Sequence, residues 1–167
     1  MEKIADYLAS LPVNDKDHPY TIPSIAELVD IDKSSGAMSS SEYDSLCSRI
    51  RNALKNTDRY LDLSGISIAN KVYSVSYGSQ SLGDLFDGCD SIVVPPMLPN
   101  PYYSDTLVLT RLYKGCDNLT TIPAGSLPTG FAYHWSEAFA GCTGLTDASG
   151  MFGSSGRVNR RSRAVRA

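Results

Sequence analysis

The feature that most constrains this 167-residue chain is a pattern that occurs three times in its second half. The pattern is apolar-x-x-apolar-aromatic-x-Gly-Cys-x-x-Ile/Leu, and its copies contain Cys89, Cys116 and Cys142, which are 27 and 26 residues apart. A unit of this length cannot bury its apolar face alone, so neighbouring units are expected to stack and share one core. The three copies, called the repeat segments below, are residues 82–92, 109–119 and 135–145.

Within each repeat segment, the spacing predicts a short helix, then a turn and a strand. The apolar-x-x-apolar-aromatic part has the i, i+3, i+4 spacing of one helical face. The glycine that follows permits a left-handed turn, and the small cysteine can point into an apolar core without a partner. Residues 92–94 and 119–122 are then expected to form short strands, each stopped by a proline.

The repeat resembles a known family most clearly in its third copy, which reads Ala-Phe-Ala-Gly-Cys-Thr-Gly-Leu at 138–145. It is similar to the BspA-like leucine-rich repeats of surface proteins from gut bacteria and their viruses. The sequence Leu-Asp-Leu-Ser-Gly at 61–65 is similar to a strand of these repeats and is expected to open a first, degenerate coil. The resemblance covers roughly residues 60–150 and implies a solenoid-like fold with a binding or structural role, not a catalytic one.

The first 58 residues are expected to be helical. A first helix carries Ile4, Leu8 and Leu11 on one face and ends at Pro12. Capping-box patterns at 24–27 and 39–42 each open another apolar-periodic stretch. The second stretch has apolar residues at helical spacing, namely Tyr43, Leu46, Cys47, Ile50 and Leu54. We expect these helices either to pack on the first coil and cap it, or to form a separate docking module.

The predicted fold is therefore α+β, with a helical N-terminal segment followed by a short leucine-rich-repeat-like solenoid of about three coils. The expected domain organisation is a helical cap or docking segment at 1–58, a leucine-rich-repeat-like array at 59–152 and a basic tail at 153–167.

The basic tail contrasts with an acidic body. Five arginines and no acid occur in the last eleven residues, which leaves ten basic against 18 acidic residues elsewhere, a formal charge of about −8. The acidic body repels phosphate, so nucleic acid is expected as a partner only through this tail. A solvated, disordered tail is the alternative. The five arginines are Arg157, Arg160, Arg161, Arg163 and Arg166.

Patterns typical of catalysis or metal binding are missing from the sequence. The cysteines and the two histidines, His18 and His134, do not have metal-ligand spacing. No Gly-x-Ser-x-Gly motif occurs, and the glycines follow no phosphate-binding spacing. We therefore predict that the chain is not an enzyme and that it has no catalytic residue, cofactor or metal.

Four aromatic or imidazole side chains outside the repeating positions form a candidate contact surface. Tyrosine suits interfaces because it combines apolar area with a hydroxyl group. Exposed loop residues without a ligand are the alternative. Trp135 aligns with Leu82 and Leu109, so a core position is expected for it rather than contact with a sugar. The candidate contact residues are Tyr102, Tyr103, Tyr133 and His134.

The end of the repeat array provides candidate assembly contacts. Apolar residues there need cover, and an uncapped array end invites aggregation unless another chain closes it. A homo-oligomer is therefore expected, a trimer if the protein is a fibre. The candidate assembly residues are Met151, Phe152, Arg157, Arg160 and Arg161.

Together these features predict a non-enzymatic structural or adhesive protein, in the first place a phage virion component such as a head or tail fibre or a decoration protein. The first residues lack the apolar stretch of a secretory signal, and no apolar run is long enough to cross a bilayer. We expect no membrane insertion, and localisation to a virion assembled in the host cytoplasm. Expected partners are other virion or surface proteins and a cell-surface glycan or protein receptor. A bacterial cell-surface adhesin and an intracellular protein-binding scaffold are the alternatives.

Overall fold

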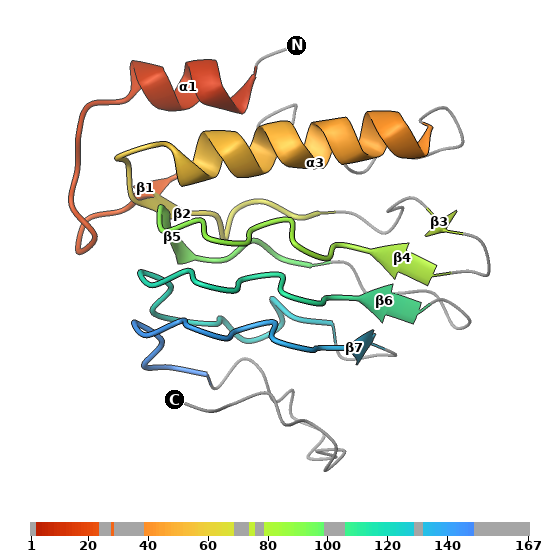
Figure 1. Ribbon diagram of the computed structural model, residues 1–167. Helices are drawn as coiled ribbons and strands as arrows, with labels where there is room; N and C mark the ends of the chain where they lie inside the picture. Colours follow the sequence, from red (N-terminus) through yellow and green to blue (C-terminus); the bar gives the residue numbers. More distant parts are fainter. Residues whose placement is uncertain are drawn as a thin grey trace.

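Two helices and two small sheets are described in the computed structural model (Figure 1). The residues that it describes are 3–23, 28, 39–68, 74–75, 79–98, 106–128 and 132–148. The helices are α1 (Ile4–Ser10) and α3 (Ser40–Lys55). The strands are β1 (Tyr20–Thr21), β2 (Leu61–Asp62), β3 (Ser74–Val75), β4 (Ser79–Ser81), β5 (Ile92–Val94), β6 (Thr106–Val108) and β7 (Ala132–His134).

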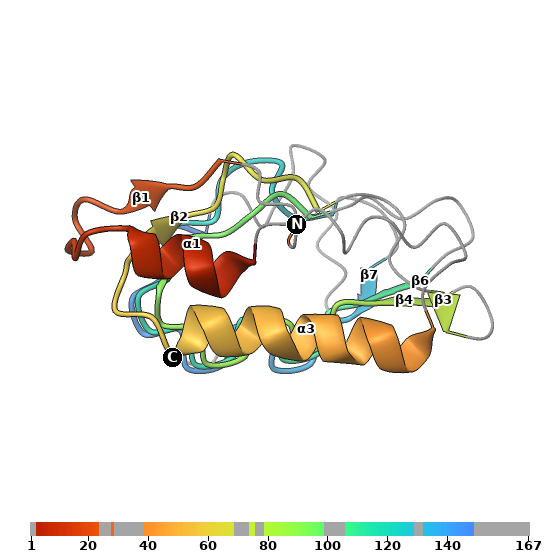
Figure 2. The same cartoon turned by 90° about the horizontal axis from the view of Figure 1, so that it is seen from above.

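The chain moves back and forth between the two sheets. One sheet has the order β1-β2-β5 and is parallel throughout. The other has the order β3-β4-β6-β7, in which β3 is antiparallel to β4 and the remaining pairs are parallel. Strands β4, β6 and β7 directly precede the three repeat segments, so successive segments lie side by side below α3 (Figures 1 and 2).

The two predicted helices at 4–11 and 39–54 are confirmed. Helix α1 buries Ile4 and Leu8, and it ends where Leu11 becomes extended before Pro12. Helix α3 begins with a complete capping box: the Ser39 amide donates to Glu42 Oε2 over 2.8 Å, and the Ser39 hydroxyl accepts from the Glu42 amide. The five apolar residues predicted for its inner face are all buried.

The segment between these helices departs from the prediction that residues 1–58 are helical. Tyr20 and Thr21 form strand β1, which pairs with Leu61 and Asp62. Prolines at positions 19 and 23 enclose this edge strand. The other capping box, at 24–27, lies outside the described residues.

The predicted leucine-rich-repeat-like solenoid is wrong. The described residues form two helices and small open sheets, and the short helix expected in each repeat segment is absent from all three. The reason lies at the third position of the pattern, where Asp84, Arg111 and Glu137 have left-handed φ values of 59°, 54° and 56°. A right-handed helix cannot pass through such a residue. Each repeat segment is a run of turns instead.

Two smaller predictions about the repeat segments have different outcomes. The glycine after the aromatic residue is left-handed in each copy, with φ of 70° at Gly88, 67° at Gly115 and 79° at Gly141, as predicted. Residues 92–94 form β5, whereas 119–122 form no strand and contribute only an isolated bridge between Thr121 and Asp147.

Backbone hydrogen bonds join each repeat segment to the next. The amides of Asp84, Phe86 and Gly88 donate to carbonyls of the second segment over 3.0, 3.0 and 2.7 Å. The second segment repeats this pattern toward the third, where the carbonyls of Ser136, Ala138 and Ala140 accept over 2.9, 2.8 and 2.8 Å. The donors of the second segment are Arg111, Tyr113 and Gly115. Alternate amides in a repeat segment therefore point in the same direction, toward the next repeat segment.

One continuous apolar core runs from α1 to the third repeat segment. The pattern's aromatic residues stack face to face, with ring centroids 5.4 Å apart for Phe86 and Tyr113 and 5.5 Å apart for Tyr113 and Phe139. Helix α3 covers the first segment, where Cys89 Sγ donates to the Arg51 carbonyl and Ser91 Oγ donates to the Leu54 carbonyl over 2.6 Å.

The inner face of α3 supports a first prediction. Leu46→Ala and Ile50→Ala each remove buried methyl groups between the helix and the core, so each should lower the free energy of unfolding by about 2–5 kcal/mol. Ser45→Ala, on the exposed face of the same helix, is the matched control and should change it by less than about 0.5 kcal/mol. Urea unfolding followed by circular dichroism measures these differences. Equal effects of core and control changes would show that α3 does not pack as described.

The middle of the aromatic stack supports a second prediction. Tyr113 is fully buried, and its hydroxyl has no hydrogen-bond partner among the residues that the structure describes. Both of its neighbours in the aromatic stack are phenylalanines. Tyr113→Phe removes the unpaired hydroxyl and keeps the ring, so it should leave stability unchanged or raise it by about 1–2 kcal/mol. Thermal unfolding would measure this. A loss of more than about 1 kcal/mol would mean that the hydroxyl is bonded in solution.

Candidate interaction surface

The three repeat cysteines are structural in their environment. All four cysteines of the chain are free thiols. Cys116 Sγ donates to the Phe86 carbonyl over 3.0 Å, and Cys142 Sγ donates to the Tyr113 carbonyl over 2.9 Å. Cys89 and Cys116 are buried as predicted, while Cys142, in the last segment, is only half-buried.

Burial makes these thiols poor nucleophiles. It raises the pKa of Cys89 to about 12 and that of Cys142 to about 11, and it raises the pKa of Cys116 further above the ordinary value. Nucleophilic chemistry and metal binding both require the thiolate. The row of thiols therefore fills the core of the repeat segments.

The histidines and acids that the structure describes do not gather into a metal site. In this part of the chain, no three His, Cys, Asp or Glu residues lie close enough to hold a metal ion. His18 Nδ1 lies 2.8 Å from Asp15 Oδ1 in an exposed turn, and this contact lowers the pKa of the Asp15 carboxyl. Among the described residues, no helix is long and apolar enough to cross a membrane.

The predicted contact residues fall at the edge of the described chain. Tyr133 and His134 belong to β7, the last strand of its sheet, which pairs with β6. Trp135 follows them and is partly buried, with its ring centroid 6.2 Å from that of Phe139. The remaining candidates lie outside the described residues and are Tyr102, Tyr103, Met151, Phe152, Arg157, Arg160 and Arg161.

Charged side chains connect the repeat segments on their exposed side. Arg111 Nε donates to Asp84 Oδ1 over 2.6 Å, and Lys114 Nζ donates to Glu137 Oε2 over 2.5 Å. The hydrogen bond from Lys114 lowers the pKa of the Glu137 carboxyl, and the hydrogen bond to Asp84 raises the pKa of Arg111. The left-handed position thus carries alternating charge: Asp84, Arg111, Glu137. This alternation is visible in the sequence when the three repeat segments are aligned. None of these three charged residues was among the predicted site residues.

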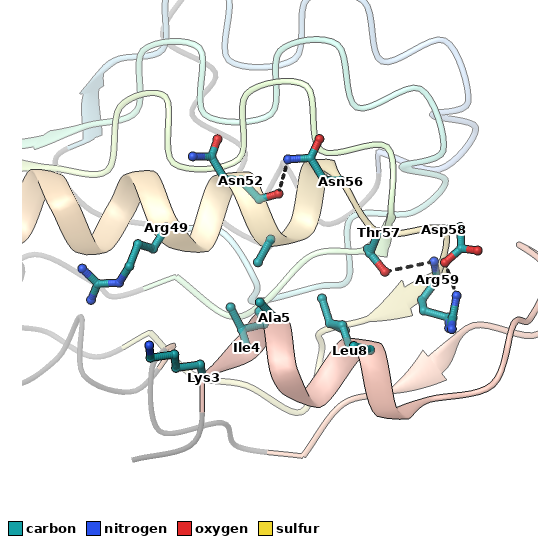
Figure 3. Close-up of a pocket in the computed structure, with 12 residues that line it drawn as sticks. Lys3, Ile4, Ala5, Leu8, Arg49, Asn52, Asn56, Thr57, Asp58 and Arg59 are labelled. Atoms are coloured by element: carbon teal, nitrogen blue, oxygen red, sulfur yellow. Dashed lines mark hydrogen bonds and ion pairs between the residues drawn. The ribbon is translucent and has the colours of Figure 1, made fainter.

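A pocket between α1 and α3 was not predicted from the sequence (Figure 3). Its volume is about 680 Å³, and Ile4, Leu8 and Ala53 contribute apolar surface to it. Lys3 and Arg49 add positive charge, while Asp58, the one carboxylate among the lining residues, is paired with Arg59. The remaining lining residues are Ala5, Ala9, Asn52, Asn56 and Thr57. Only tertiary contact between the two helices creates this pocket, so no local sequence signal marks it.

Two hydrogen bonds made by residues that line the pocket hold its walls, and one of them connects distant parts of the chain. Arg59 Nε donates to the Leu11 carbonyl over 2.7 Å, and the Asn56 side-chain amide donates to the Asn52 carbonyl over 2.8 Å. The bond from Arg59 holds the loop that follows α3 against the end of α1, and the bond from Asn56 caps the end of α3.

Comparison with known proteins gives no relative from which a function could be transferred. No protein-family model, no curated protein and no solved structure matches the chain.

The buried thiols support a third prediction. Their raised pKa means that the folded protein keeps protons that the unfolded chain releases above about pH 9. The free energy of unfolding should therefore fall between about pH 9 and 12, by up to about 1.4 kcal/mol per pH unit for each buried thiol. Cys116→Ala should show a shallower fall in parallel urea titrations. Identical pH profiles for the variant and the parent would contradict burial of this thiol.

Proposed function

We propose that this chain is a non-enzymatic structural or adhesive protein and, more specifically, a phage virion component that uses its repeat segments for assembly or receptor contact. The observation that carries the proposal is the single apolar core that continues through all three repeat segments. Backbone hydrogen bonds and stacked rings join these segments along their length. Such a body is close-packed and can hold exposed loops in fixed positions for contact with a partner.

The state of the cysteines supports assembly in a reducing compartment. The four free thiols are what a protein made and assembled in a cytoplasm contains, whereas small secreted domains are commonly held by disulfides. Virion proteins assemble in the host cytoplasm, so the thiols favour this proposal over a secreted adhesin. The sequence resemblance to BspA-like surface proteins, which include viral members, gives the proposal its adhesive component.

An intracellular protein-binding scaffold is the second candidate. The same free thiols suit it, and the open pocket between α1 and α3 offers a contact surface that does not depend on a particle. The two candidates differ in where the protein is found. A virion component is present in a fixed ratio to the other particle proteins, whereas a scaffold is not.

Fractionation separates the candidates and provides the fourth prediction. A culture that produces the chain is separated into nuclease-resistant particles, cell envelope and soluble cytoplasm, and an antibody to the purified chain is used to quantify it in each. The proposal expects the protein to sediment with the particles through a density gradient and to remain there after a salt wash. A cytoplasmic enzyme and an envelope protein serve as markers. Recovery only in the soluble fraction would favour the scaffold, and recovery only in the envelope would favour the adhesin.

A further inference from the structure

The pocket between α1 and α3 is positively charged, although the body of the chain is acidic. Its described lining includes one of the chain's 18 acidic residues, Asp58, and that carboxylate is paired with Arg59. The same lining includes three of the ten basic residues that lie outside the tail, namely Lys3, Arg49 and Arg59. Since cations outnumber the carboxylate here and acids outnumber cations elsewhere, the charge of this pocket favours an anionic ligand.

The middle of the pocket is apolar. Ile4 and Leu8 are buried core residues that line it, and Figure 3 places their side chains between the two helices. Ala5 and Ala9, one helical turn apart on α1, and Ala53 on α3 complete this apolar part. Alanine side chains end at Cβ, so the helices leave a space of about 680 Å³. Pockets of about 300–1,000 Å³ with apolar walls and a few polar groups are typical binding sites.

The two ends of the pocket differ in chemistry. Lys3 and Arg49 lie at one end, and the residues that follow α3 lie at the other (Figure 3). A ligand with an aliphatic group next to a carboxylate would therefore place the carboxylate at the first end and bury the aliphatic group in the middle.

The second end suits a peptide backbone. Thr57 Oγ1 accepts a backbone amide over 3.2 Å, which leaves its hydroxyl proton able to donate. The Asn56 side chain uses its nitrogen to bond a helix carbonyl over 2.8 Å, and its oxygen can accept. One donor and one acceptor are what a peptide unit requires. A free fatty acid would leave both groups unused, so the ends together favour a peptide.

We propose that this pocket binds a short segment of a partner protein in which an acidic residue lies next to an aliphatic one. The carboxylate binds at the end that carries Lys3 and Arg49, the aliphatic side chain packs on Leu8, and Asn56 and Thr57 bind the backbone. The arginine tail of a second copy does not suit the site, because it has the same charge as the pocket. The inference rests on the protein-binding role proposed above, and it holds for a particle component and for a scaffold alike.

An NMR titration of the full chain at low salt tests the proposal and is the fifth prediction. The probe is a short peptide of alternating leucine and glutamate, blocked at both termini. The amides of Ile4, Leu8 and Ala53 should shift and reach saturation. The same peptide with glutamine in place of glutamate should bind at least about threefold more weakly, because it keeps the shape and loses the charge.

Two variants locate the site. Lys3→Glu reverses one charge of the lining and should weaken binding by about three- to tenfold. Lys16→Glu makes the same change in an exposed turn outside the pocket and is the matched control, with an expected change of less than about twofold. Ala53→Leu fills part of the pocket and should also weaken binding by about threefold or more. The thermal unfolding midpoint of each variant verifies that the fold is intact, and Lys3→Glu is exposed and should keep it.

Four outcomes would overturn the proposal. They are no saturable shift at the pocket, equal binding of the glutamine peptide, equal weakening by Lys3→Glu and Lys16→Glu, and tighter binding of decanoate than of the peptide at the same amides. The last would assign the pocket to free aliphatic carboxylates. Because the titration uses the purified chain, its outcome is separate from that of the fractionation. Peptide binding by a chain recovered only from the soluble cytoplasm would reject the particle role and keep the site.

Discussion

The backbone hydrogen bonds between repeat segments are the interaction on which the rest of the structure depends. They exist because Asp84, Arg111 and Glu137 adopt the left-handed conformation, which turns alternate amides toward the neighbouring segment. This conformation costs roughly 1–2 kcal/mol at a residue other than glycine. Three hydrogen bonds for each contact, together with the stacked aromatic rings, offset that cost. The repeat therefore stabilises a conformation that no single segment would adopt alone.

The two ends of the stack differ in polarity and in cover. At the first segment, α3 supplies carbonyl acceptors from Arg51 and Leu54, and β1 is a two-residue edge strand between two prolines. Such a short, proline-bounded edge resists pairing with other chains. At the third segment, the equivalent amides of Glu137, Phe139 and Gly141 have no acceptor among the described residues.

The interior and the surface have separate roles in the proposed function. Inside, thiols and rings at repeated positions fill space, and burial keeps the thiols protonated. Outside, ion pairs such as Arg111 with Asp84 are exposed, so they set register and charge pattern more than stability. The edge strand β7 and the pocket between α1 and α3 are the described surfaces on which a partner could bind.

The sequence by itself determined the features that depend on neighbours along the chain. Helix α3 follows from its capping box and its apolar spacing, and the left-handed glycines follow from their place after the aromatic residue. The periodic cysteines predicted the inward row, in which Cys89 and Cys116 are buried and Cys142 is half-buried. The candidate contact surface stays a prediction: Tyr133 and His134 lie in β7, and Tyr102 and Tyr103 lie outside the described residues.

The tertiary structure alone decided how the repeat segments fold and what surrounds them. An i, i+3, i+4 spacing fits both a helix and a run of turns, and the hydrogen bonds to a segment about 27 residues away select the turns. For the same reason, the local sequence pattern did not predict the open sheets or strands β4, β6 and β7. Each of these short strands is formed only by pairing with its parallel neighbour. The pocket likewise needs α1 and α3 to meet. Contacts between distant residues have no local sequence signature. In this chain they determine the turn conformation of the repeat segments, although the apolar spacing predicted a helix.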